Sequence, residues 1–125
     1  MSIIETNSLV LAYLGDSIYE IYVRKYLINL GINKVNDLQE KSKQYASAKN
    51  QALFLKLMLD NNFFSEEEIN IIKRGRNAKS VSKPKGVDII TYKHATALES
   101  LIGYLYLNNK ISRIEEIMNY IWSIK

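Results

Sequence analysis

Apolar residues recur every three or four positions along almost the whole chain, which is the spacing of one face of an α-helix. Segments that alternate apolar and polar residues are nearly absent, and Pro84 is the single proline. The pattern predicts an all-α fold, a bundle of about six or seven helices. Because 125 residues are enough to bury one core, we expect one domain over residues 1–125.

Residues that favour helix ends predict two helices in the first part of the chain. Asn7 or Ser8 can cap a first long helix, which runs to about Leu30 and is followed by Gly31. Asn36 can cap a second, polar helix with the sequence NDLQEKSKQ.

Two more helix starts are predicted in the middle of the chain. Ser47 opens a third helix, SAKNQALFLKLMLD. Its buried stripe is expected to include Leu53, Phe54 and Leu57. Ser65 is followed by three glutamates in the pattern of a capping box, and the fourth helix that it starts is predicted to end near Gly75.

The last part of the chain carries two further helical patterns. A fifth helix is expected from about Ile89 to Asn108. A second capping box, formed by Ser112 and Glu115, is predicted to start a sixth helix with the sequence RIEEIMNYIWSIK.

The segment KRGRNAKSVSKPKG, from Lys73 to Gly86, breaks the helical pattern. It contains six basic residues, no acid, two glycines and the proline, and therefore predicts a basic loop at about residues 73–88. One interpretation is a solvated loop. The other is an arm that contacts phosphate groups, because arginine donates paired hydrogen bonds to phosphate oxygens. The net charge of +4 is a modest indication of a polyanionic partner.

The composition restricts the chemistry. There is no cysteine, which excludes disulfides, zinc–thiolate sites and cysteine nucleophiles, and His94 is the single histidine. A metal ion would need oxygen ligands, which favours magnesium, manganese or calcium. The chain lacks the pattern of a secretory signal and any apolar run of roughly 20 residues, so we expect a cytoplasmic protein with no membrane partner.

Two acidic residues stand in unusual places. Asp16 follows Gly15 in the middle of the apolar first helix, although both residue types are poor interior helix formers. Glu99 lies in an apolar helix with Gly103 four residues later. Two helices that carry glycines can cross closely and bring these carboxylates to a shared divalent metal. Glu20 follows Asp16 at i+4 and shares its face. The alternative is that the two acids form surface ion pairs.

Several segments of the chain resemble a known family. LAYLGDSIYE resembles the signature helix of ribonuclease III catalytic domains, and ALESLIGYLYL resembles their second acidic helix. SAKNQAL resembles the helix between them. With RGRNAKS and YKHATALESLIGYLYL, the whole chain is similar to the short Mini-ribonuclease III branch, which lacks a double-stranded RNA-binding domain.

The resemblance implies the ribonuclease III helical bundle and a magnesium-dependent endoribonuclease, with manganese as a substitute. Asp16 and Glu99 would be the catalytic and metal-binding residues. Larger members have two more acids, where this chain has Ala12 and Thr96, so the number of metal ions is left open. The resemblance also implies a homodimer that hydrolyses phosphodiester bonds of double-stranded RNA, with a precursor of large-subunit ribosomal RNA as the natural substrate.

Duplex RNA is recognised mainly through its phosphates and 2′-hydroxyls, so basic residues are the expected contacts. The RNA-binding candidates are Arg74, Arg76, Asn77, Lys79, Lys83 and Lys85, with Lys49 and Lys93 as additions. The Thr96 hydroxyl either positions a water at the metal or is a tolerated helix residue. His94 is interpreted as a structural residue or an RNA contact rather than a general base.

Two other functions compete with this hypothesis. One is a ribonuclease III fold that has lost catalysis and binds structured RNA, as the missing acids at Ala12 and Thr96 would allow. Retention of both Asp16 and Glu99 argues against it. The other is a helical protein-interaction domain whose basic arm serves solubility or an acidic partner.

Overall fold

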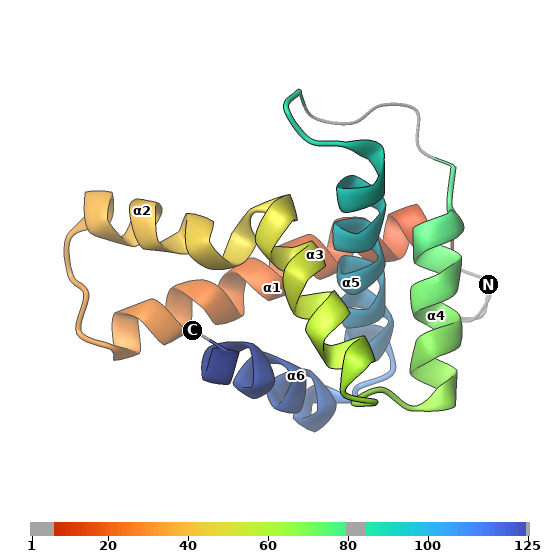
Figure 1. Cartoon of the computed structure of the whole chain (residues 1–125). Coiled ribbons are helices and arrows are strands. Elements are labelled where there is room, and N and C mark those ends of the chain that lie inside the picture. Colours follow the sequence, from red (N-terminus) through yellow and green to blue (C-terminus); the bar gives the residue numbers. More distant parts are fainter. Residues whose placement is uncertain (1–6, 80–84, 125) are drawn as a thin grey trace.

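The computed structural model describes residues 7–79 and 85–124, and this part of the chain is all-α, as predicted. The described residues form six helices (Figure 1). They are α1 (Ser8–Asn29), α2 (Val35–Ala46), α3 (Ala48–Asp60), α4 (Glu66–Asn77), α5 (Ile89–Leu107) and α6 (Ile111–Ile124).

Helix α5 is the centre of the fold (Figure 1). It packs against α1, α3, α4 and α6, most extensively against α1. Between Ala95 and Leu105 every residue of α5 is buried except Glu99, which is half-buried. An acidic side chain therefore interrupts the most buried segment of the molecule.

Three of the predicted helix starts are confirmed. The Asn7 side chain caps α1 by accepting from Leu9 N, and the Ser47 side chain caps α3 by accepting from Asn50 N. Ser65 and Glu68 form the predicted capping box of α4. These starts could be predicted because a cap depends on hydrogen bonds between residues two or three positions apart.

Two predicted caps are wrong, because their helices begin earlier. Asn36 lies inside α2, whose N-cap is Lys34 without a side-chain hydrogen bond. Ser112 lies inside α6, which begins at Ile111 directly after a tight turn. In that turn Asn109 has φ 59°, and Lys110 N donates to the Leu105 carbonyl at 2.8 Å. The turn ends α5 and leaves no extended residue at position 112 to serve as a cap.

The prediction that Leu53 belongs to the buried stripe of α3 is also wrong. Leu53 is 44% exposed, whereas Phe54 is buried and Leu57 is half-buried. The buried face of α3 is made by Gln51, Phe54, Leu55 and Met58.

The predicted basic loop begins too early in the chain. Helix α4 continues through Gly75 to Asn77, so the first part of KRGRNAKS is helical. Gly75 is buried against α5, and a Cβ atom there would lie 2.9 Å from the Ala97 Cα and the Ser100 Oγ. The glycine is thus explained by close helix packing and not by a turn.

A buried ion pair ties α4 to α6. Arg113 donates from Nε to the Glu68 carboxylate at 2.8 Å and from Nη2 to the Phe63 carbonyl at 2.8 Å. Burial alone would raise the pKa of Glu68, but the hydrogen bonds from Arg113 and Ser65 and the charge of Arg113 hold it below its usual value. No helix among the described residues has the length and apolar character needed to cross a membrane.

Candidate active site

Helices α1 and α5 cross in close contact at two glycines. A Cβ atom on Gly15 would strike the backbone carbonyl of Glu99, and one on Gly103 would strike the carbonyl of Leu11. Each glycine therefore lets the backbone of the other helix lie directly against it. This is the close crossing that the two glycine-bearing acidic helices led us to expect.

The crossing brings the side chains of Asp16 and Glu99 together. The Asp16 carboxyl lies close enough to that of Glu99 to disfavour ionisation of Glu99. Burial, followed by the hydrogen bond and negative charge of Asp16, raises the pKa of Glu99 from 4.5 to about 9. Asp16 is exposed and Glu99 half-buried, so the pair is open to solvent on the Asp16 side.

Among the described residues, neither the Asp16 nor the Glu99 carboxylate forms an ion pair with a basic side chain. Glu20, on the same helix as Asp16, pairs with Arg24 at 2.8 Å. The alternative interpretation as surface ion pairs therefore does not describe the two carboxylates at the crossing.

The pair has no third acidic neighbour in the described part of the chain, where no group of three or more metal-binding side chains occurs. Ala12 and Thr96, the positions at which the resemblance implies further acids in larger family members, are both buried. The Thr96 hydroxyl donates to the Tyr92 carbonyl at 2.9 Å. Because its proton is engaged by the helix backbone, the geometry favours a packing role for Thr96.

Gln51 is a polar neighbour of the site that sequence reasoning missed. Its side chain is 3% exposed, and its Nε2 donates to Glu99 Oε2 at 3.5 Å. A signal was present, since Gln51, Phe54, Leu55 and Met58 follow the spacing of one helix face. An amide on an otherwise apolar stripe indicates a buried polar partner.

The basic candidates lie on several elements. Arg74, Arg76 and Asn77 are in the last turns of α4, and Lys79 follows that helix. Lys85 precedes α5, while Lys83 lies outside the described residues. A groove of about 580 Å³ is lined by Lys73, Arg74, Asn77 and Lys79 together with the start of α1.

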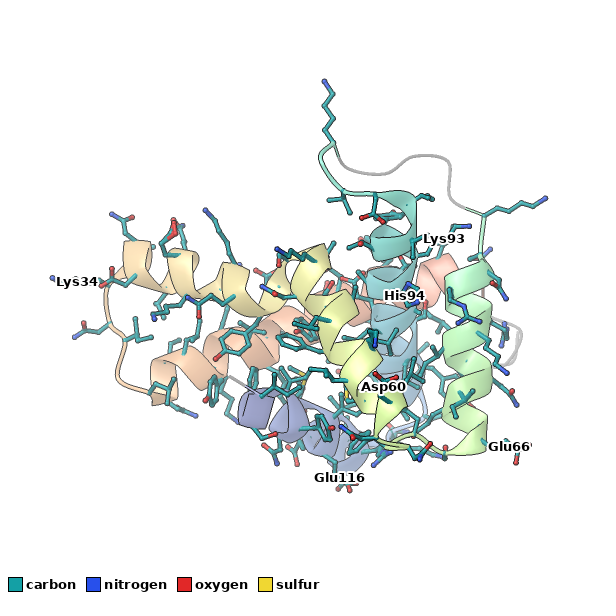
Figure 2. All side chains as sticks on the ribbon, viewed as in Figure 1. Lys34, Asp60, Glu66, Lys93, His94 and Glu116 are labelled. Atoms are coloured by element: carbon teal, nitrogen blue, oxygen red, sulfur yellow. The ribbon has the colours of Figure 1, made fainter. Side chains whose placement is uncertain are left out.

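Charged side chains lie at both ends of the bundle. Figure 2 shows Lys93 in the first half of α5, toward the end of the bundle where α4 ends. Asp60, Glu66 and Glu116 lie toward the opposite end.

His94 donates from Nδ1 to the Ile90 carbonyl at 2.8 Å, which favours its structural interpretation. Lys49 is exposed in the first turn of α3, the helix that carries Gln51.

Comparison with known proteins defines the class of protein to which the chain belongs. Residues 9–110 match the ribonuclease III domain. The chain therefore belongs to the ribonuclease III family of endoribonucleases.

Its relatives narrow the position within the family. The chain is 49% identical over 121 residues to Mini-ribonuclease 3 of Enterococcus faecalis, covering 97% of this chain and 90% of that protein. It is 51% identical over 119 residues to Mini-ribonuclease 3 of Brevibacillus brevis, covering 95% and 87%. The crystal structure of a Fusobacterium nucleatum protein has a TM-score of 0.87 at 36% identity, covering 97% of this chain and 98% of that one. The resemblance drawn from the sequence is thereby confirmed.

Proposed function

We propose that the chain is a metal-dependent endonuclease of double-stranded RNA, with Asp16 and Glu99 as its catalytic carboxylates. The observation that carries the proposal is the carboxyl pair at the crossing of α1 and α5, with which no basic side chain of the described residues forms an ion pair. By the sequence resemblance, we extend the proposal to a precursor of large-subunit ribosomal RNA as the natural substrate.

The two carboxylates fit a magnesium ion, for which manganese is the expected substitute. Magnesium prefers oxygen ligands and is commonly held by one or two carboxylates, with the rest of its shell left to water and substrate phosphate. Burial and the charge of Asp16 raise the pKa of Glu99 to about 9, so a cation held by these two residues would offset the cost of their negative charge. When bound, such an ion polarises a phosphate and lowers the pKa of an attacking water.

The chain supplies the geometry of this site through rigid elements. Glu99 is carried by the most buried segment of α5, so its backbone has little freedom to move. Asp16 is exposed on α1, where a phosphate can reach it from solvent. The site needs no side-chain nucleophile, which agrees with a chain that has no cysteine and one histidine.

Incubation of the purified chain with duplex RNA tests the proposal and its rivals. With magnesium we expect cleavage of both strands, and with EDTA binding without cleavage. Binding without cleavage in magnesium would instead support the RNA-binding module, and no binding would support the protein-interaction domain. Because a proton on Glu99 competes with the cation, the magnesium concentration for half-maximal cleavage should fall as the pH rises from 6 to 9.

Basic residues near the end of α4 are proposed to contact RNA phosphates. Lys73, Lys79 and Lys85 are all exposed, and two of them line the groove between α4 and the start of α1. Replacing these three lysines with alanine should weaken binding to all duplexes about equally. Each lost phosphate contact lowers the slope of log affinity against log salt by roughly 0.7–0.9, so the slope should fall by about 2–3.

A control variant removes three positive charges from other parts of the surface. Lys34, Lys41 and Lys110 are also exposed, and Figure 2 shows Lys34 far from α4. Their replacement with alanine should leave the salt slope almost unchanged, as measured by filter binding from 50 to 200 mM salt. Equal effects of the two triple variants would mean that the α4 surface has no special contact with RNA.

A homodimer is the remaining part of the proposal. Four large apolar side chains of α1 stay exposed, with Val10 at 56%, Tyr13 at 82%, Ile21 at 60% and Ile28 at 57%. Burial of such a face between two copies is favourable. Sedimentation at micromolar concentration should give twice the 14.5 kDa chain mass, and Ile21→Glu should lower it toward one chain. A monomer that still cuts both strands at the wild-type rate would contradict the dimer.

A further inference from the structure

Gln51 places a neutral hydrogen-bond donor beside one of the two candidate catalytic carboxylates. It lies in the first turn of α3, and its side chain is 3% exposed. A buried amide must find a partner, since an unsatisfied polar group inside a protein is costly. The partner is Glu99, whose Oε2 accepts from Gln51 Nε2 at 3.5 Å.

The first turn of α3 is held firmly in place. Gln51 N donates to the Ser47 carbonyl at 2.9 Å, and Asn50 N donates to the Ser47 side chain at 3.3 Å. Directly before this turn, the Tyr45 carbonyl accepts from the buried Tyr19 hydroxyl at 2.6 Å. Tyr19 is on α1, three residues after Asp16, so the helix that carries Gln51 begins at a point tied to the helix that carries Asp16.

An amide suits this position better than a basic side chain would. A lysine or arginine at position 51 would form an ion pair with Glu99 and compete with a cation for its charge. An amide donates a hydrogen bond and leaves the charge in place. Partners of this kind orient metal-binding side chains in many proteins.

We propose that Gln51 is a positioning residue, which holds one oxygen of Glu99 so that the carboxylate is presented correctly to a divalent cation and the substrate phosphate. This inference rests on the proposed function. It assigns to α3 a part in the site beyond the two carboxylates of α1 and α5.

Manganese binding gives a test that does not depend on activity. Gln51→Met keeps the length of the side chain and removes its donor. Electron paramagnetic resonance of free manganese should show an affinity about 10- to 100-fold lower for the variant than for the wild-type chain. Duplex RNA affinity in EDTA should stay unchanged. Cleavage should fall at low magnesium and recover in part as the magnesium concentration is raised.

Gln44→Met is the matched control, because Gln44 is exposed on α2. It should bind manganese and cleave RNA as the wild type does. If Gln51→Met folds and its manganese affinity and magnesium dependence equal those of the wild type, the positioning role is overturned while the proposed function stands. If the wild type itself neither binds manganese nor cuts duplex RNA, the proposed function has failed.

A second variant covers the case in which Gln51→Met does not fold, judged by circular dichroism and its melting temperature. Gln51→Asn keeps the amide but is one methylene shorter, so it should not reach Glu99 and should show the same loss of manganese affinity. If neither variant folds, or if a loss of activity follows the melting temperature with no change in metal affinity, Gln51 serves the core alone and the inference is wrong.

Discussion

Replacement of Glu99 by glutamine is expected to slow cleavage of duplex RNA about thousandfold or more, and Asp16→Asn should do the same. Each amide keeps the shape of the acid but loses the charge that would hold a cation. A bound cation contributes several kcal/mol of charge stabilisation in the transition state. Since about 1.4 kcal/mol corresponds to tenfold in rate, the loss should reach about thousandfold in single-turnover experiments with saturating enzyme.

The fold should survive this change. The folded chain raises the pKa of Glu99 to about 9, whereas in the unfolded chain the carboxyl ionises near its usual value. Folding at pH 7 must therefore take up a proton at Glu99, which lowers stability. In EDTA at pH 7, Glu99→Gln should therefore melt at the wild-type temperature or slightly above it. Glu20→Gln is the matched control, since Glu20 pairs with Arg24, and it should cut RNA within about twofold of the wild-type rate. Near wild-type cleavage by Glu99→Gln would remove the carboxylate pair from the mechanism.

Gly15→Ala is expected to disrupt both the fold and the site. The added methyl group would strike the backbone carbonyl of Glu99, which cannot move aside as a side chain can. Helices α1 and α5 would have to separate, at a cost at or above the upper end of the roughly 1–3 kcal/mol typical of overpacking. Separation would also draw Asp16 away from Glu99. Urea denaturation should show the loss of stability, and cleavage should be lost even in protein that remains folded.

Gly31→Ala is the control for this variant. Gly31 has φ 93° and nothing within 4 Å of an added Cβ, so alanine there meets backbone strain of about 1–2 kcal/mol without a clash. It should retain full cleavage. If Gly15→Ala were as stable and as active as Gly31→Ala, the close crossing would not be what positions the two acids.

The helices were predictable from local sequence signals, and the errors occur where contacts between distant segments decide the structure. The caps at Asn7, Ser47 and Ser65 depend on near neighbours in the chain, so residue type was enough. The basic loop was predicted to begin too early, at about residue 73, because Gly75 and the basic residues around it are typical of a loop. The glycine is required instead by its contact with Ala97 and Ser100 of α5, which lie 22 and 25 residues later and which no local pattern reveals.

The site residues were predictable where they depart from the residue types that usually occur inside apolar helices. Asp16 and Glu99 were recognised because each lies in an apolar helix with a glycine nearby, an arrangement that secondary structure alone does not favour. Gln51 breaks only a weaker rule, since a single amide at the start of a helix is common. Its partner comes from α5, so its place became visible only with the packed helices.

The central claim is that Asp16 and Glu99 together bind a divalent cation at the crossing of α1 and α5. The most direct test is diffraction from crystals of the whole chain grown with manganese, recorded at a wavelength where manganese scatters anomalously. We predict an anomalous peak about 2.0–2.2 Å from carboxylate oxygens of both residues, near the distances typical of hard divalent cations. A peak at other residues, or none between these carboxylates at a manganese concentration that supports cleavage, would contradict the account.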